Sequence, residues 1–149
     1  MAVTKNNPYT IHLGGPCTIV NDIAASEAIL PGHLIERVSG AYRKHADNQA
    51  RAQGCFALNQ PEINKDFDYP YAALDLVVAG VGVPGSSFLA WLASGENATD
   101  GDLLTSAGDG TLEVTADPAI ATARAIEDKD ATFDDTYASG DVRIRVELL

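Results

Sequence analysis

Short runs of alternating apolar and polar residues, separated by glycine-containing turns, recur along this chain of 149 residues. Residues 103–115 alternate around Gly108-Asp109-Gly110, which is typical of a β-hairpin because its turn needs positive φ angles that glycine tolerates. Residues 34–45 alternate around Ser39-Gly40 and predict a second hairpin with charges on its open face. Further apolar runs that we predict to be strands lie at 17–20, 54–58, 75–78, 87–92 and 141–146. The pattern therefore predicts a mainly β protein with little helix.

Two segments leave the choice between helix and another conformation open. Residues 22–30 fit either a short helix or a loop, and Pro31-Gly32 ends them. Asp117-Pro118, followed by an alanine-rich run, resembles the capped start of a helix. Against a helix, larger residues alternate with alanine over 118–128, as they would in a strand. We favour a strand for that segment.

One ten-residue pattern occurs twice. Residues 67–76 and 133–142 both read F-D-x-x-Y-A-x-x-D-[LV], and E-x-x-x-x-G-x-L-[IL] likewise begins at Glu27 and again at Glu96. We therefore predict two tandem, pseudo-symmetric β units of small barrel or sandwich type, spanning residues 16–81 and 82–149 in one domain or two packed lobes. The aromatic residues of the repeated motif would fill the core and its aspartates would hold turn amides. The motif residues are Phe67, Asp68, Tyr71, Asp75, Phe133, Asp134, Tyr137 and Asp141.

Residues 1–15 lie outside the repeat and are predicted to form an extended N-terminal arm, because Asn6-Asn7-Pro8 and Gly14-Gly15-Pro16 interrupt any regular element. Tyr9, Ile11 and Leu13 would lie on one side of a strand. The arm is either a frayed terminus or a segment ordered by a partner.

The charge is strongly acidic and uneven. Ten Lys and Arg against 21 Asp and Glu give −11, of which residues 81–149, with four basic and thirteen acidic side chains, carry −9. Such a surface repels phosphate backbones, so nucleic acid is not an expected partner. No run of about 18 apolar residues and no apolar N-terminal signal occur, so we expect neither a membrane span nor standard export. Cys17 and Cys55 are expected to be free thiols in strands.

The candidate chemical sites are weak. Residues 100–104 begin like a calcium loop, but leucine stands where a third oxygen ligand is needed. His12, His33 and His45 are scattered and are expected to be surface or half-buried residues without a metal. The repeated aspartates fit turn capping better than catalysis, and residues 80–85 do not fit a dinucleotide loop because Pro84 interrupts them. We therefore predict no catalytic residues, no metal, no cofactor and no enzymatic activity.

The order of these motifs resembles that of the head decoration, or capsid cement, proteins of tailed bacteriophages. The resemblance covers about residues 27–149, and its most specific parts are residues 101–112 and the closing residues 143–149. It implies a virion protein that binds the major capsid protein on the outer surface of the expanded head, commonly as a homotrimer at local threefold axes. Before assembly the protein would be in the host cytoplasm. The arm could then contact the capsid or another copy through Pro8, Tyr9, Ile11 and Leu13.

Two other classes of function remain open. A β module displayed on the virion could bind a carbohydrate or host-surface ligand, and Trp91 or an exposed tyrosine in a groove would favour it. Another minor head or tail structural role is the second alternative. An enzyme would need a pocket with convergent titratable groups, which the sequence does not supply.

Overall fold

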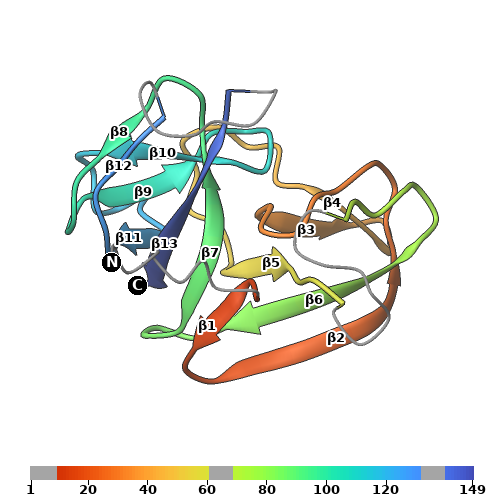
Figure 1. Cartoon of the computed structure of the whole chain (residues 1–149). Helices are drawn as coiled ribbons and strands as arrows, with labels where there is room; N and C mark the ends of the chain where they lie inside the picture. The colour runs from red at the N-terminus through yellow and green to blue at the C-terminus, as the bar shows by residue number, and fades with distance from the viewer. Residues whose placement is uncertain (1–9, 61–68, 132–139) are drawn as a thin grey trace, which may run out of the picture.

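The chain is built of β-strands arranged in two side-by-side lobes (Figure 1). The computed structural model describes residues 10–60, 69–131 and 140–149, and in these ranges it contains thirteen strands and no helix. The predicted mainly β fold is thus confirmed. The described ranges also contain no helix that is long and apolar enough to cross a lipid bilayer.

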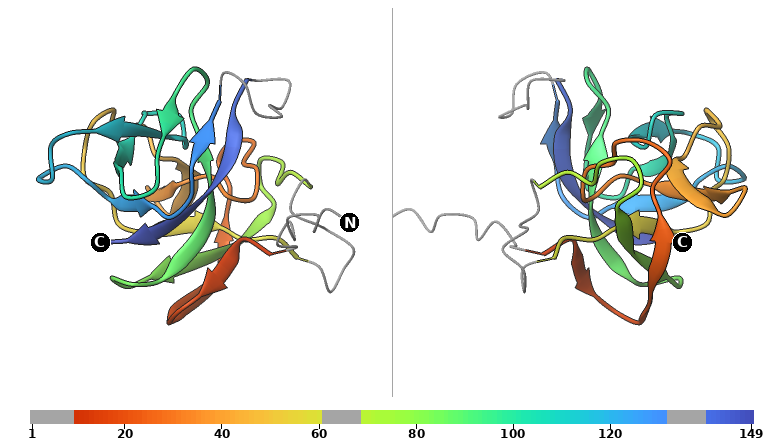
Figure 2. Two further views of the ribbon diagram at one scale, coloured as in Figure 1. Left: turned by 60° about the vertical axis from the view of Figure 1, so that its left-hand side comes forward. Right: turned by 90° about the vertical axis from the view of Figure 1, so that its right-hand side faces the viewer.

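The C-terminal lobe, lobe 2, is a closed five-stranded barrel. Its strands follow each other around the barrel in the order β7-β10-β9-β11-β13, and β13 then pairs with β7 to close the ring. Figure 2 shows β7 and β13 from two further sides. A short ladder of β8 (Asn97–Ala98) and β12 (Lys129–Asp130) lies beside it. The barrel strands are β7 (Ser87–Leu92), β9 (Leu103–Ser106), β10 (Leu112–Thr115), β11 (Ala123–Ala125) and β13 (Val142–Leu148).

Lobe 1 consists of a three-stranded sheet and a hairpin. The sheet has the order β2-β6-β5, and the hairpin pairs β3 with β4 around Ser39 and Gly40, whose φ angles of 52° and 80° are the positive values that a two-residue turn requires. Single bridges link Leu34 to Phe56 and Ala25 to Tyr42. The strands of lobe 1 are β2 (Cys17–Ala24), β3 (Ile35–Val38), β4 (Ala41–Lys44), β5 (Cys55–Ala57) and β6 (Leu76–Gly82).

The pairings of lobe 1 follow the same order as those of lobe 2. The antiparallel pairs β2–β6, β5–β6 and β3–β4 correspond to β7–β13, β11–β13 and β9–β10. The parallel bridge from Ala25 to Tyr42 corresponds to the parallel pair Leu92–Leu112. The two lobes thus share an order of strand pairing, and their origin as two tandem copies of one unit stays a prediction.

Equivalent turns in the two lobes are built in the same way. Gly32 and Gly101 both have φ of 97°, and each donates its N–H to an alanine carbonyl, of Ala57 and Ala125 respectively, at 2.8 Å. One residue further on, a side chain accepts from the turn backbone: His33 Nδ1 from Leu30 N–H at 3.0 Å, and Asp102 Oδ2 from Thr99 N–H at 2.9 Å. An imidazole and a carboxylate therefore cap matching turns.

The described part of the N-terminal arm packs on lobe 2. Strand β1 (His12–Gly14) pairs antiparallel with β7, and Leu89 N–H donates to the Ile11 carbonyl at 2.7 Å. Ile11 is fully buried, and Asn59 Oδ1 accepts its N–H at 3.1 Å. Ile11 thus completes the core of the barrel. In the sequence, the whole of lobe 1 separates this segment from the barrel strands.

The core is continuous across the lobes. Its larger apolar cluster contains the barrel residues together with Leu34, Phe56 and Leu58 of lobe 1, and the Phe56 and Phe88 rings stack with centroids 4.8 Å apart. A second cluster fills lobe 1. Burial of one large apolar side chain contributes about 1.5–3 kcal/mol, so this shared layer holds the two lobes together.

The two open segments are not helical. Strand β2 extends to Ala24 with a bulge between Val20 and Ile23, and the segment after it bridges Ile29 to Tyr71. In 118–128, where we favoured a strand, only Ala123–Ala125 forms one. Residues 118–120 form a turn in which Asp117 Oδ1 accepts Ala119 N–H at 2.9 Å, as a helix-capping aspartate would. No helix follows, because Thr122 N–H donates to the Leu104 carbonyl of β9 at 2.8 Å.

Candidate functional surfaces

The described residues of the repeated motif have structural roles. Tyr71 is buried and donates its hydroxyl to the Leu58 carbonyl at 2.5 Å. Asp75 Oδ2 accepts Ala72 N–H in its own turn, and Asp141 Oδ1 accepts Ser94 N–H at the end of β7, both at 2.9 Å. Each carboxylate thus accepts one backbone N–H. Phe67, Asp68, Phe133, Asp134 and Tyr137 lie outside the described residues.

The predicted contact residues of the arm are divided in the same way. Pro8 and Tyr9 lie outside the described residues. Ile11 belongs to the barrel core, and Leu13 packs against that core from a half-buried position. Both thus act within the chain, and a capsid contact through this segment stays a prediction.

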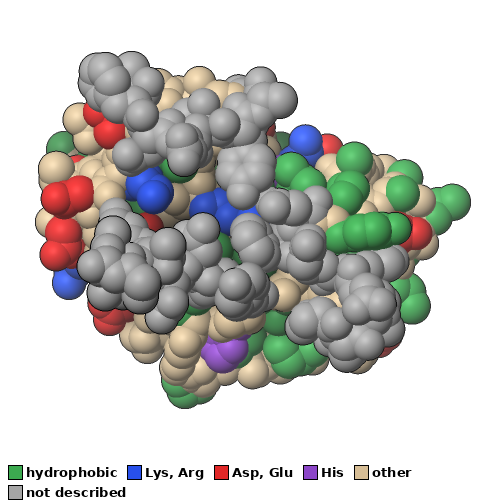
Figure 3. Space-filling view, viewed as in Figure 1, with side chains coloured by type: hydrophobic (Ala, Val, Ile, Leu, Met, Phe, Trp, Pro, Cys, Tyr) green, Lys and Arg blue, Asp and Glu red, His purple; other side chains and the backbone are tan. Residues whose placement is uncertain are grey.

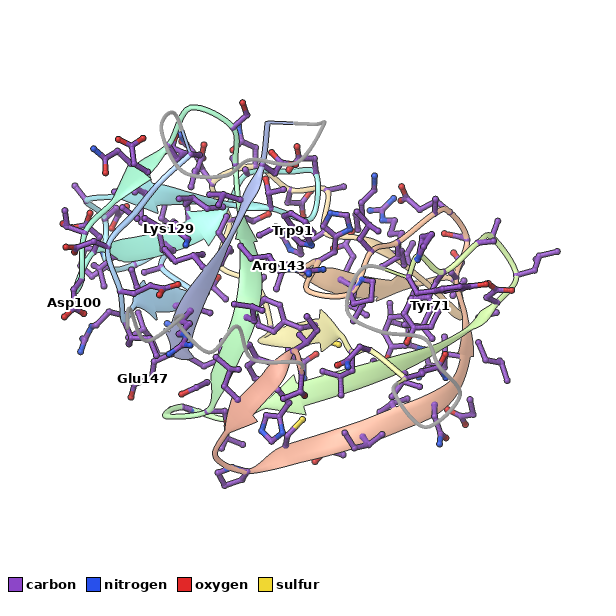
Figure 4. The ribbon with its side chains drawn as sticks, viewed as in Figure 1. Tyr71, Trp91, Asp100, Lys129, Arg143 and Glu147 are labelled. Carbon is purple, nitrogen blue, oxygen red and sulfur yellow. The ribbon has the colours of Figure 1, made fainter. Side chains whose placement is uncertain are left out.

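A cation–π pair lies at the junction between the lobes. Figure 4 shows Arg143, on β13, beside Trp91, on β7, and the guanidinium carbon is 4.4 Å from the centre of the indole ring. Trp91 Nε1 and Arg143 Nη2 both donate to the Pro31 carbonyl, each at 2.9 Å. Both side chains are buried. Trp91 therefore supports the core and does not line an exposed ligand groove.

Two of the histidines are more buried than the sequence suggested, while His12 is half-buried as expected. The centroids of the His33 and Trp91 rings lie 6.0 Å apart. Burial lowers the pKa of the His33 imidazole to about 4; the positive charges of Lys44 and Arg143 lower the pKa further, and the negative charge of Asp109 opposes them. His45 Nδ1 lies 2.7 Å from Ser106 Oγ on β9. The expectation of surface or half-buried positions is thus wrong for His33 and His45. Both are buried because they contact residues of lobe 2 that are distant in the sequence, Trp91 and Ser106 respectively.

His45 also lies among carboxylates. Its Nε2 is 3.6 Å from Glu36 Oε2, and one donor atom from each of Glu36, His45 and Asp47 lies within 4.8 Å of the others. Arg43 pairs with the other carboxylate oxygen of Glu36 at 2.7 Å. A cavity of about 400 Å³ adjoins the group and is also lined by Arg37, Tyr42, Arg51 and Gln53. The sequence analysis did not predict this group. The hairpin predicted over residues 34–45 nevertheless places Glu36 opposite the end of its second strand, close to His45.

Both cysteines are free thiols, as expected. Cys17 pairs with Gly82 and Cys55 with Val81, on opposite sides of β6. Burial raises the pKa of Cys55 to about 12 and also raises that of Cys17. Burial therefore disfavours the reactive thiolate form of both residues.

Three of the seven exposed large apolar side chains of the described residues lie in one short segment. In residues 69–76, Tyr69 is 50%, Leu74 85% and Leu76 59% exposed, and Leu74 has a positive φ of 75°. We call residues 69–76 the apolar segment. A leucine in the left-handed region of φ and ψ destabilises the fold, and an exposed leucine gains no burial in return. Strained residues of this kind often lie at contact sites.

Acidic side chains gather at the other end of the molecule. On the face shown in Figure 3, hydrophobic side chains lie mainly at the end of lobe 1, and acidic ones lie mainly over lobe 2. Exposed carboxylates of lobe 2 include those of Asp100, Asp117 and Asp128. On this face, the hydrophobic and the acidic side chains therefore lie mainly at opposite ends.

The fold is similar to that of a protein from a bacteriophage head. No protein-family model and no curated protein match the chain. Among solved structures, the N base of head fiber gp8.5 in bacteriophage phi29 superposes with a TM-score of 0.60 and 14% sequence identity. The match covers 90% of this chain and 95% of that chain. At this identity the likeness is one of fold, and it extends over both lobes.

Proposed function

We propose that this chain is a structural virion protein that binds the exterior of a bacteriophage capsid and stabilises the expanded head. The observation that carries the proposal is the fold shared, over nearly the whole of both chains, with a head fiber base. The resemblance of its motifs to head decoration proteins supports the same role independently. Its partners would be the major capsid protein and two further copies of itself at a local threefold axis.

The physical properties of the chain suit a rigid clamp. The lobes share one apolar core through Phe56 and Phe88, so force on one lobe is transmitted to the other through close-packed side chains. A module that binds only the expanded shell stabilises that shell by mass action. No catalytic step is part of this role.

The apolar segment is the surface that we assign to the capsid. Leu74 and Leu76 are exposed aliphatic side chains, and their burial against a capsid subunit would contribute favourable free energy. The acidic end of lobe 2 would then face solvent, away from the shell and its packaged DNA.

Co-sedimentation with capsids tests the proposal. Purified protein is mixed with expanded capsids and, separately, with unexpanded procapsids, and bound copies are counted per capsid subunit at several salt concentrations. We expect saturation near one copy per capsid subunit on expanded shells only. Absence of binding to both shells would overturn the proposal.

A second candidate is a minor head protein that anchors an appendage, and the description of the structural neighbour as the base of a head fiber favours it. The same experiment separates the two roles. An anchor would saturate at a small number of copies per particle, whereas a cement protein covers the whole shell. A carbohydrate or host-surface ligand is less well supported, since Trp91 is buried.

A further inference from the structure

The hairpin of lobe 1 brings three metal-ligating side chains together. Glu36 lies on β3, and His45 and Asp47 follow β4, which pairs with β3 in register from Ile35–Lys44 to Val38–Ala41. Their donor atoms lie within 4.8 Å of one another, and His45 Nε2 is 3.6 Å from Glu36 Oε2. Ligands in a tetrahedral zinc site lie about 3.4 Å apart when the bonds are about 2.1 Å long, so the 3.6 Å between His45 and Glu36 is close to that of a shared ion. The set as a whole, within 4.8 Å, would need the carboxylate of Asp47 to turn inward.

The imidazole is held in a ligating orientation. His45 is 6% exposed, and its Nδ1 lies 2.7 Å from Ser106 Oγ, which leaves Nε2 directed at the carboxylates. The backbone of His45 is also fixed, because its N–H donates to the Leu34 carbonyl at 2.9 Å and its carbonyl accepts from Gly110 N–H at 3.2 Å. A hydrogen bond at the second ring nitrogen is the usual way in which proteins orient a metal-binding histidine.

The carboxylates complement this arrangement. Arg43 occupies Glu36 Oε1 at 2.7 Å, so Oε2 is the oxygen left to face His45. Asp47 is exposed and can turn its carboxylate toward the same point. The adjoining cavity of about 400 Å³ has room for the water molecules that complete a coordination shell.

We propose that Glu36, His45 and Asp47 bind one divalent transition-metal ion, with Zn²⁺ as the best fit. One imidazole with two carboxylates suits Zn²⁺, Co²⁺ and Ni²⁺, whereas Ca²⁺ and Mg²⁺ prefer an all-oxygen set. The bound ion would link the hairpin of lobe 1 to the segment after it, in which Gln49 N–H donates to the Ser106 carbonyl of lobe 2 at 2.8 Å. The metal would thus stiffen the junction between the lobes.

Calorimetric titration of the untagged, metal-free protein with ZnCl₂ tests the proposal, and the d–d absorption of added Co²⁺ reports the ligand geometry. We expect one saturable site and a higher melting temperature with Zn²⁺. Asp47→Asn should weaken binding at least about tenfold without affecting the fold, because Asp47 is exposed, and His45→Gln should abolish binding. The matched controls are Asp22→Asn, also an exposed carboxylate of lobe 1, and His12→Gln, which removes an imidazole outside the group.

Ser106→Ala tests the positioning role of the hydroxyl, with an expected loss of about 10–100-fold in Zn²⁺ affinity. The proposal is overturned if no saturable site is found, or if Asp47→Asn and Asp22→Asn bind Zn²⁺ equally. Because the titration uses the purified chain alone, its result is independent of capsid binding, and either proposal can fail without the other.

Discussion

The guanidinium of Arg143 lies 4.4 Å from the ring centroid of Trp91, and both side chains donate to the carbonyl of Pro31. One backbone oxygen of lobe 1 is thereby held by two strands of the barrel. The arrangement links the lobes by a polar contact inside a largely apolar junction, where hydrogen bonds and cation–π attraction are stronger than in water.

The coupling between these two side chains can be measured with a double-mutant cycle. We expect Arg143→Met and Trp91→Leu each to lower the free energy of unfolding, and the double variant to lose less than their sum. The coupling should be about 1–2 kcal/mol, as for a desolvated cation–π pair, in urea denaturation. Purely additive losses would show that the two side chains act independently.

Stability should depend on the protonation of His33. Its pKa in the folded chain is about 4, below the ordinary value of 6.5, because burial disfavours the charged ring. Between pH 6.5 and 4 the unfolded chain therefore binds the proton more readily than the folded chain. The stabilisation that neutral His33 gives to the folded chain is thus fully present above pH 6.5 and is lost as the pH falls toward 4. We expect a loss of about 3 kcal/mol over this range, measured by urea denaturation at several pH values.

His33→Asn is the informative variant, since an amide oxygen can still accept Leu30 N–H, as Asp102 accepts Thr99 N–H in lobe 2. Between pH 6.5 and 4, the free energy of unfolding should fall less in this variant than in the unaltered protein, because the variant has no imidazole at position 33 to protonate. His12→Asn, at a half-buried site, serves as the control. An unchanged profile in His33→Asn would contradict the assignment.

The two equivalent glycines should differ in their tolerance of alanine. Both have φ of 97°, so a Cβ costs about 1–2 kcal/mol in backbone strain at either position. At Gly32 that Cβ would also lie 2.9 Å from the Leu89 carbonyl oxygen and 3.2 Å from Trp91, whereas at Gly101 it meets nothing within 4 Å. Gly32→Ala should thus lower the free energy of unfolding by about 1–3 kcal/mol more than Gly101→Ala. Equal melting temperatures for the two variants would refute this difference.

Leu74 should show a conflict between stability and binding. Leu74→Gly relieves a positive φ of 75° in a side chain that is 85% exposed, so we expect the folded chain to gain about 0.5–1 kcal/mol. If the apolar segment contacts the capsid, the same change should weaken co-sedimentation with expanded shells. The control is Ile126→Ser, which removes an exposed aliphatic side chain from lobe 2. Equal capsid binding by both variants would exclude Leu74 from the contact.

Local patterns predicted most of the strands. The hairpins around Ser39-Gly40 and Gly108-Asp109-Gly110 were predictable because alternation and turn chemistry act over a few residues. The segment 118–128 was harder, since Asp117 caps a turn with the same bond that would cap a helix, and the distant Leu104 carbonyl takes the Thr122 N–H. Pairing of His12 with Phe88 joins positions that no local pattern connects.

The sequence by itself determined the mainly β class, the acidic charge and the positions of the special turns, because these follow from composition and short-range sterics. The tertiary structure alone decided which polar residues became buried and which of them meet. His45 reaches Ser106, and Arg143 reaches Pro31, only after the two lobes pack on a common core. Burial, pKa and metal-ligand geometry depend on such long-range contacts, since they are set by the neighbours of a side chain in space.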